Sequence, residues 1–378
     1  MSGPPNWAPA NPAERYLHID IIRGVALFGV LIVNLETVFR APLLEHILQP
    51  SVENGWANHL ADLLITRVLE FKAWTIFSFL FGVGIAIQSE RFAPPGAGAT
   101  SFLARRFGWL FLLGATHLFL VWNGDILALY GLCGILLLPS LGLRPSALLV
   151  IGAAAMALPE FLPIPLPIPT GQAATAHIAE ARDVYGNGGF LAILVFRWRE
   201  SWSLIVPLLI SILPRTVGLM YCGVAAWRSG ILREPALHRG KLMAALAIGT
   251  AAGAVYESLP ALLALAYVSA LLLLLTPERA ARLPGLAAAG RMALTNYLVQ
   301  SIVLGFIFYG YGFGLFGRIG SAAAACIGVT IYFVQIQLSR LWLDRFQFGP
   351  FEWLWRSLTY GQRQPMQRRI EQIGRKMS

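Results

Sequence analysis

Four polar residues lie at or within apolar segments and have side chains that could carry out chemistry. His117 lies in the apolar run 109–121, Asp125 follows a short polar corner, and Asn34 and Arg215 lie in two other apolar runs. Ionisable groups at membrane depth are costly and mark a functional site by default. A His can act as base or nucleophile, a carboxylate can orient its ring, and an amide can donate to an oxyanion. We therefore predict His117, Asp125 and Asn34 as catalytic residues.

Each of these residues also has a structural interpretation. His117 can be a hydrogen-bonded link between packed helices, and so can Asn34. Asp125 follows Asn-Gly, so its carboxylate can cap the N-terminus of the next helix. Arg215 follows Pro214 and can satisfy carbonyl groups that a proline kink leaves unpaired. The sequence leaves both interpretations open for all four residues.

The elements that carry these residues are predicted to be membrane helices. The 378-residue chain is 57% hydrophobic and 13% charged, with a mean hydropathy of +0.64. A soluble domain is nearer one quarter charged, and the apolar residues here come in blocks of about 20, which span a bilayer. The composition predicts an all-α, polytopic membrane protein. Its net charge of +10 therefore indicates basic cytoplasmic loops and no nucleic-acid partner.

The apolar blocks predict about ten transmembrane helices in a compact bundle, with segment 190–202 as an interfacial helix. Lys and Arg gather in alternate loops, which puts both termini in the cytoplasm and the chain in a bacterial inner membrane. We divide the chain into a loose N-terminus (1–18), one transmembrane domain (19–343) and a basic cytoplasmic tail with an interfacial segment (344–378). The predicted spans are 19–39, 68–88, the hairpin 109–138 as two spans, a fifth ending near 158, 204–227, 242–256, 259–275, 292–309 and 321–342.

Helical rise places the four polar residues at similar depth. Asn34 and His117 each lie eleven positions beyond an arginine near the cytoplasmic boundary, about 16 Å into the membrane. Arg215 lies about 20 Å from the same face, and Asp125 lies at the outer rim. Equal depth does not establish contact, but it permits one polar layer in the outer half. We expect Asn34 and His117 to face a cavity open to the outside, with Asp125 at its mouth.

Several sequence blocks resemble the YeiB-like family of bacterial membrane proteins. They extend from Arg15 to about residue 360 and so cover nearly the whole chain. The blocks are HIDIIRGVALFG at 18–29 with Asn34, FSFLFGVG at 77–84, His117 with NGDIL at 123–127, GRMALTNYLVQ at 290–300 and GPFEWLWRSLTY at 349–360.

The first helix is also similar to that of the transmembrane acyltransferase superfamily, which includes the lysosomal heparan glucosaminide acetyltransferase. The similarity rests on Asp20, Arg23, Gly24 and Asn34. It implies that acyl-CoA enters from the cytoplasm, that the acceptor lies outside, and that a His stands between them. In the lysosomal enzyme that His follows the first helix in an outer loop. His46 is the nearest residue here, although its surroundings do not match, so we predict His117 and keep His46 as a rival.

The cytoplasmic half contains residues suited to the phosphates of such a donor. Asp20 and Arg23 lie one helical turn apart, where they can pair. The planar guanidinium group suits phosphate, although positive-inside anchoring explains these arginines equally well. The aromatic tail segment 351–360 is predicted to lie at the inner interface, with closure of the donor site as the alternative. The predicted donor-binding residues are Asp20, Arg23, Arg105, Arg106, Arg291, Asn296 and Gln300.

Two functions fit these features. The first is a membrane acyltransferase that moves an acyl group from cytoplasmic acyl-CoA to a hydroxyl or amine of a small molecule or glycan outside. Arg215 and His46 are the predicted acceptor-side residues, and no metal is expected because the three cysteines lie apart. The alternative is a transporter of a small amphipathic solute, disfavoured because no inverted repeat is evident. The lipid bilayer is the expected partner, and an oligomer is left open.

Overall fold

The computed structural model describes residues 16–48, 54–91, 97–255 and 260–367. Its named elements in these ranges are all helices, and a single isolated β-bridge joins Phe346 to Gln367. The prediction of an all-α, polytopic membrane protein is therefore confirmed. The helices are α1 Leu17–Asn34, α2 Leu43–Leu48, α3 Trp56–Leu64, α4 Lys72–Glu90, α5 Ala97–Thr116, α6 Leu127–Leu137, α7 Pro145–Phe161, α8 Gly171–Asn187, α9 Phe190–Glu200, α10 Val206–Arg228, α11 Arg239–Val255, α12 Pro260–Leu274, α13 Pro277–Ala281, α14 Pro284–Arg291, α15 Ala293–Phe308, α16 Ser321–Arg345 and α17 Pro350–Tyr360.

Four described segments are long and apolar enough to cross a bilayer: Leu17–Phe39, Trp56–Glu90, Phe190–Arg228 and Ser321–Arg345. A fifth crossing is made if α14 and α15, which meet at a bend of 81°, act as one broken span. Three shorter apolar helices, Leu127–Ser140, Pro145–Phe161 and Pro260–Leu274, complete the apolar elements. The count of about ten spans, which rests on apolar block length, stays a prediction.

The segment 190–202 differs from the interfacial helix that the sequence predicts. α9 continues through a π-helical segment, Ser201–Ile205, into α10, which gives one helical stretch of 39 residues. Arg197 and Glu200 are enclosed by protein, whereas Trp198 and Arg199 on the same helix are exposed. The region between the fifth predicted span and this segment contains the polar helix α8.

Glycines allow the central helices to approach backbone to backbone, as is common in membrane bundles. A Cβ atom at Gly290 of α14 would lie 1.9 Å from the Asp20 carbonyl oxygen of α1. A Cβ at Gly82 of α4 would lie 2.1 Å from the Met220 carbonyl oxygen of α10. Gly82 is therefore a packing residue, whereas Gly84 has open space beside it.

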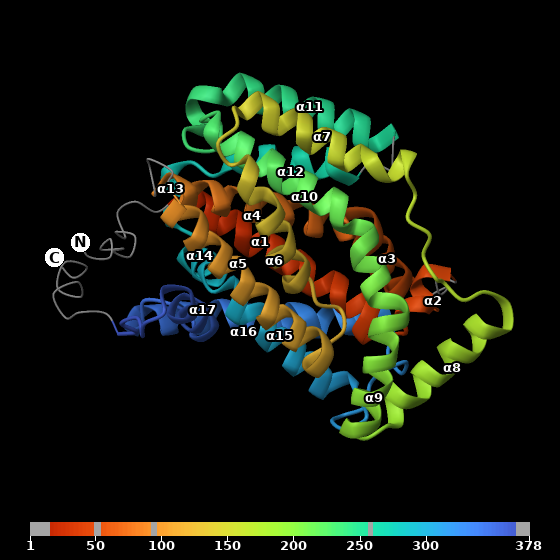
Figure 1. The fold of residues 1–378 in the computed structure, drawn as a ribbon. Coiled ribbons are helices and arrows are strands. Elements are labelled where there is room, and N and C mark those ends of the chain that lie inside the picture. Colours follow the sequence, from red (N-terminus) through yellow and green to blue (C-terminus); the bar gives the residue numbers. More distant parts are fainter. Residues whose placement is uncertain (1–15, 49–53, 92–96, 256–259, 368–378) are drawn as a thin grey trace.

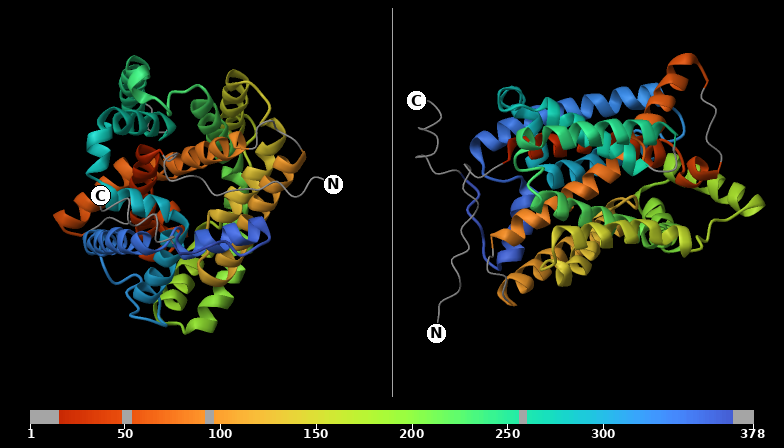
Figure 2. Two further views of the ribbon diagram at one scale, coloured as in Figure 1. Left: turned by 90° about the vertical axis from the view of Figure 1, so that its left-hand side faces the viewer. Right: turned by 90° about the horizontal axis from the view of Figure 1, so that it is seen from above.

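The ends of the bundle carry different elements. α1 lies at the centre, α13 and α17 lie at one end, and α2 and α8 lie at the opposite end (Figure 1). The same separation is seen from above in the right-hand view of Figure 2. If the basic tail is cytoplasmic, α17 marks the inner face and α8 the outer face.

Tag insertion tests this sidedness. A tag after Gly171 in α8 should be labelled from outside intact cells, and a tag after Gly240 in α11 should not. Both positions have open space beside the backbone, so neither insertion should disturb packing. The reverse labelling pattern would show that the inner and outer faces are assigned the wrong way round.

A pair of glycine substitutions tests the close packing of α4 on α10. Gly82→Ala should lower the melting temperature of the detergent-purified protein, because overpacking a close contact costs about 1–3 kcal/mol. Gly84→Ala is the matched control on the same helix, since no atom lies within 4 Å of its added Cβ. Equal melting temperatures for the two variants would contradict the backbone contact.

Candidate functional site

A cavity of about 370 Å³ extends into the bundle between α1, α4, α5, α15 and α17. The side chains of α4 that line the cavity change from polar to apolar along the helix. Gln88 and Arg91 line one end, while Phe77, Leu80 and Phe81 line the other. Phe77 and Arg91 are fourteen residues apart, or about 21 Å of helix. The cavity is thus a long slot with a polar end and an apolar end.

Two other helices repeat this polarity. α1 contributes Asp20 and Arg23 at the polar end and Val30 deeper in the slot. α5 contributes Arg106 at the polar end and Leu110 one turn further in. Because the polar residues of all three helices lie toward α17, the polar end is the predicted cytoplasmic end.

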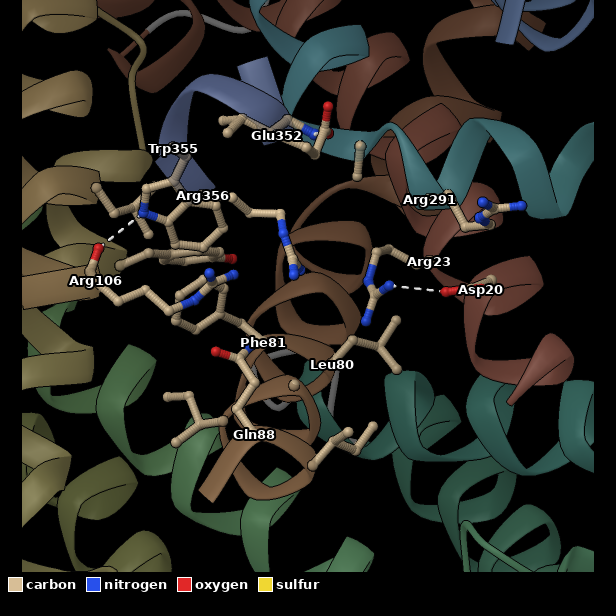
Figure 3. Close-up of a pocket in the computed structure, with 18 of the residues that line it drawn as sticks. Asp20, Arg23, Leu80, Phe81, Gln88, Arg106, Arg291, Glu352, Trp355 and Arg356 are labelled. Carbon is tan, nitrogen blue, oxygen red and sulfur yellow. Dashed lines mark hydrogen bonds and ion pairs between the residues drawn. The ribbon is translucent and has the colours of Figure 1, made fainter. Parts of the chain in front are cut away.

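Guanidinium groups from different elements meet at this polar end. Arg23, Arg106 and Arg356 reach the same space from α1, α5 and α17, with Arg291 at its edge (Figure 3). Arg23 pairs with Asp20 at 3.0 Å, as the one-turn spacing predicts. The structure therefore brings together four of the predicted donor-binding residues, Asp20, Arg23, Arg106 and Arg291.

Helix α17 covers the polar end, which is the alternative that the sequence left for the tail segment. The Trp355 indole nitrogen donates to the Arg106 carbonyl oxygen at 2.8 Å, and the Arg106 guanidinium lies 3.6 Å from the Trp355 ring centroid. The half-buried Glu352 carboxylate accepts hydrogen bonds from the Leu294 and Thr295 amides at 2.8 and 3.0 Å. Burial raises the pKa of Glu352, although the donors from Thr295 and Leu294 act in the opposite direction.

The sequence did not single out Glu352, Trp355 and Arg356 as site residues. The only local signal for them is the Gly349-Pro350 helix start followed by alternating aromatic and charged residues. Such a segment equally fits an amphipathic helix at the membrane surface. Its contact with α5 and α15 depends on residues far away in the chain.

The other three predicted donor residues do not line this cavity. Arg105 is exposed on α5. The Asn296 amide nitrogen donates to the Ala289 carbonyl oxygen at 3.1 Å and to Ser339 at 3.0 Å. Gln300 donates to the Gln335 side chain at 2.8 Å. Asn296 and Gln300 therefore link α15 to α16 by buried hydrogen bonds.

The predicted His–Asp pair lies just beyond the apolar end. Tyr130 and Tyr297 line that end, and the His117 ring centroid lies 5.5 Å from that of Tyr297. His117 Nδ1 is 2.8 Å from Asp125 Oδ1, and both residues are almost fully buried. The second Asp125 oxygen accepts the Ala128 amide at 2.9 Å. Asp125 therefore both caps the start of α6 and contacts the imidazole, so the two interpretations of this residue are compatible.

The second imidazole nitrogen of His117, Nε2, is buried and has no hydrogen-bond partner. If Nδ1 donates to an ionised Asp125, a neutral imidazole keeps its lone pair on Nε2. A lone pair on an imidazole that a carboxylate orients is suited to take a proton. The pair thus has the arrangement of a base and the group that orients it.

Asn34 does not share a cavity with His117. It lines a small space with Gln300, Ser301 and Tyr297, and Tyr297 lies between this space and His117. Asp125 is 1% exposed, so it does not lie at the mouth of a cavity. The structure therefore does not show the expected shared cavity, because Tyr297 separates the space at Asn34 from His117.

The acceptor-side residues predicted from the sequence lie apart from the pair. Arg215 of α10 pairs with Glu160 of α7 at 2.5 Å, and both side chains are largely exposed. His46 of α2 is 2.8 Å from Glu70. Burial lowers the pKa of His46, but its hydrogen bond to Glu70 and the nearby carboxylates outweigh this, so the net shift is upward. The described structure shows no bond from either residue to His117 or Asp125.

The three cysteines, Cys133, Cys222 and Cys326, are free and lie on different helices. Within the described residues, no group of three or more His, Cys, Asp or Glu side chains could hold a metal ion.

Comparisons with known proteins agree with the sequence blocks. Residues 239–362 match the family model described as "Protein of unknown function (DUF418)". The uncharacterized protein YxaH of Bacillus subtilis (strain 168) is 34% identical to this chain, covering 96% of this chain and 98% of the relative. The uncharacterized protein YeiB of Escherichia coli (strain K12) is 27% identical, covering 92% of this chain and 96% of the relative. No solved structure matches.

These matches extend over nearly the full length of the relatives and include the helices that form the cavity and the His117–Asp125 pair. They do not establish the similarity to the transmembrane acyltransferase superfamily, which stays a hypothesis. By its identity to YxaH over almost the whole chain, the protein belongs to the YeiB-like family of membrane proteins.

Proposed function

We propose that the protein is a bacterial inner-membrane acyltransferase that moves an acyl group from a cytoplasmic acyl-CoA to an outer-face hydroxyl or amine. The observation that carries the proposal is the long slot, which has arginines at one end and His117 behind the other. A ligand that fits it has an anionic head and an extended, mainly apolar arm. Acyl-CoA has this form, with phosphates at one end and a thioester at the other.

The polar end has the charge that such a donor requires. Five arginines and two carboxylates line the cavity. Guanidinium groups bind phosphate through charge-assisted, often bidentate hydrogen bonds. A donor whose phosphates lie among Arg23, Arg106 and Arg356 would extend its arm along α4 toward Tyr297.

At the apolar end, His117 would act on the acceptor. In this step Nε2 removes the acceptor proton while the acceptor oxygen or nitrogen attacks the thioester carbon. The bond from that carbon to sulfur breaks, and the departing thiolate takes the proton from the imidazolium to leave as the thiol. Asp125 would hold the ring and stabilise its cation while the proton resides there.

The alternative is a transporter that uses the same slot to move an amphipathic anion. The slot favours the enzyme, because its inner end stops at Tyr130 and Tyr297, with a buried base directly behind Tyr297. A transporter is expected to build its site between two repeats at the bilayer midplane. The acceptor, a small molecule or glycan, would approach from the side of α8.

Mutation of the proposed base is the direct test. His117→Ala should reduce transfer from labelled acyl-CoA by about 10²–10⁴-fold, the usual contribution of a positioned base. Binding of CoA should be retained, because His117 does not line the polar end. Asp125→Asn should be milder if the carboxylate only orients the ring.

His46→Ala is the necessary companion, since the superfamily resemblance places the reactive His nearer to α2. An inactive His46→Ala together with an active His117→Ala would show that the base is misassigned. If the native protein consumes no labelled acyl-CoA, the enzyme proposal fails.

The donor end can be tested by binding alone. Arg356→Gln should weaken CoA binding, measured by calorimetry in detergent, roughly 10-fold or more, because a hydrogen bond to a charged group contributes about 1.5–3 kcal/mol. Arg363→Gln is the matched control: Arg363 lies near Trp353, at 5.7 Å from its ring, and does not line the cavity. Equal affinities for the two variants would remove Arg356 from the donor site.

A further inference from the structure

A second histidine–carboxylate pair lies on the outer side of the bundle. His177 of α8 places Nε2 at 3.0 Å from Glu200 Oε1, at the end of α9. Glu200 is buried, whereas the His177 side chain is 21% exposed and so reaches the outer surface. The hydrogen bond to Glu200 raises the pKa of His177, although partial burial acts in the opposite direction.

The other oxygen of Glu200 accepts a hydrogen bond from the corner, residues 122–126, which contains Asp125. Glu200 Oε2 accepts hydrogen bonds from the Asn123 amide and from the Tyr185 hydroxyl, each at 2.7 Å. Hydrogen bonds to a carboxylate are the strong ones, and here the donors come from α8 and from the corner. Glu200 therefore joins three parts of the chain at one buried point.

Glu200 supplies one of several contacts to the corner: the buried Trp122 stacks on Phe39 at 4.6 Å between ring centroids, and the Tyr297 hydroxyl donates to the Gly124 carbonyl oxygen at 3.4 Å. Residues 122–126 separate a π-helical segment, His117–Val121, from α6, and they form no helix themselves. Asn123 and Asp125 are two positions apart in this short connection. Asn123 is hydrogen-bonded to Glu200, and Asp125 is hydrogen-bonded to His117. Only one residue, Gly124, separates Asn123 from Asp125, so the path from Glu200 to the His117–Asp125 pair is short.

We infer that Glu200 is a positioning residue for the His117–Asp125 pair, acting through Asn123, and that His177 connects this support to the outer face. Glu200 touches neither His117 nor the large cavity, so it has no direct part in the proposed transfer. Its effect on turnover rests on the proposed function, whereas its effect on His117 does not. The outer helix α8 thereby contributes to the geometry of a site that the sequence places almost entirely on other elements.

The test is hydrogen exchange at the ring carbon of His117 in the full-length protein, followed by mass spectrometry as a function of pH. Glu200→Gln should shift the pH at which His117 ring-carbon exchange is half-maximal. The shift should have the same direction as that caused by Asp125→Asn and be smaller. Glu180→Gln is the matched control: Glu180 pairs with Arg199 at 2.5 Å on the exposed surface nearby. Its His117 profile should coincide with that of the native protein.

A native His117 profile in folded Glu200→Gln would overturn the inference. If that variant does not fold, Tyr185→Phe decides by the same criterion, because it removes the hydroxyl that donates to Glu200 and accepts from the Asn123 amide at 3.3 Å, and keeps the ring beside Tyr309. Where acyl-CoA is consumed, Glu200→Gln should lower kcat about 10-fold, as expected for a displaced reacting group, and leave the KM for the donor unchanged. A displaced profile without acyl-CoA turnover would support the inference while the proposed function fails.

Discussion

The Asp125 carboxylate is the constraint on which the half of the bundle farther from α17 depends. One oxygen starts α6 by accepting the Ala128 amide, and the other contacts His117 at the end of the preceding helix. A buried backbone amide or imidazole without a partner would cost about 1–3 kcal/mol, so this residue satisfies two groups at once. The corner is short, and the two helices that it joins pack closely at Gly114 of α5 and Gly131 of α6.

Three of the described π-helical segments lie at or next to a buried ionisable residue in this half of the bundle. Glu36 lies in the π-helical segment Leu35–Phe39, His117 begins another, and Glu200 immediately precedes a third. π-helical turns are often found at functional sites because they displace side chains from the regular helical register. The three segments come from α1, α5 and α9, so the polar interior is built from local distortions of otherwise regular helices.

The sequence predicted well what depends on nearby residues. The Asp20–Arg23 pair, the tight corner before Asp125 and the apolar runs of α1 and α4 follow from spacing within one segment. It failed where a side chain finds its partner on a distant helix. Asn296 and Gln300 were assigned to a ligand because their partners on α16, Ser339 and Gln335, cannot be inferred from periodicity.

Helix α17 also covers the cavity through contacts with helices that are distant in the sequence, and it shapes the electrostatics of the cavity. The Glu352 carboxylate occupies the first turn of α15, which would otherwise offer free amides to an anion. An anionic ligand in the slot is therefore left to the guanidinium groups of Arg23, Arg106 and Arg356, which come from three separate elements. Since such groups act together only when α1, α5 and α17 are assembled, the affinity proposed for the polar end would be a property of the folded bundle. No single segment carries it, and this is why the motif at the N-terminus alone cannot identify the ligand.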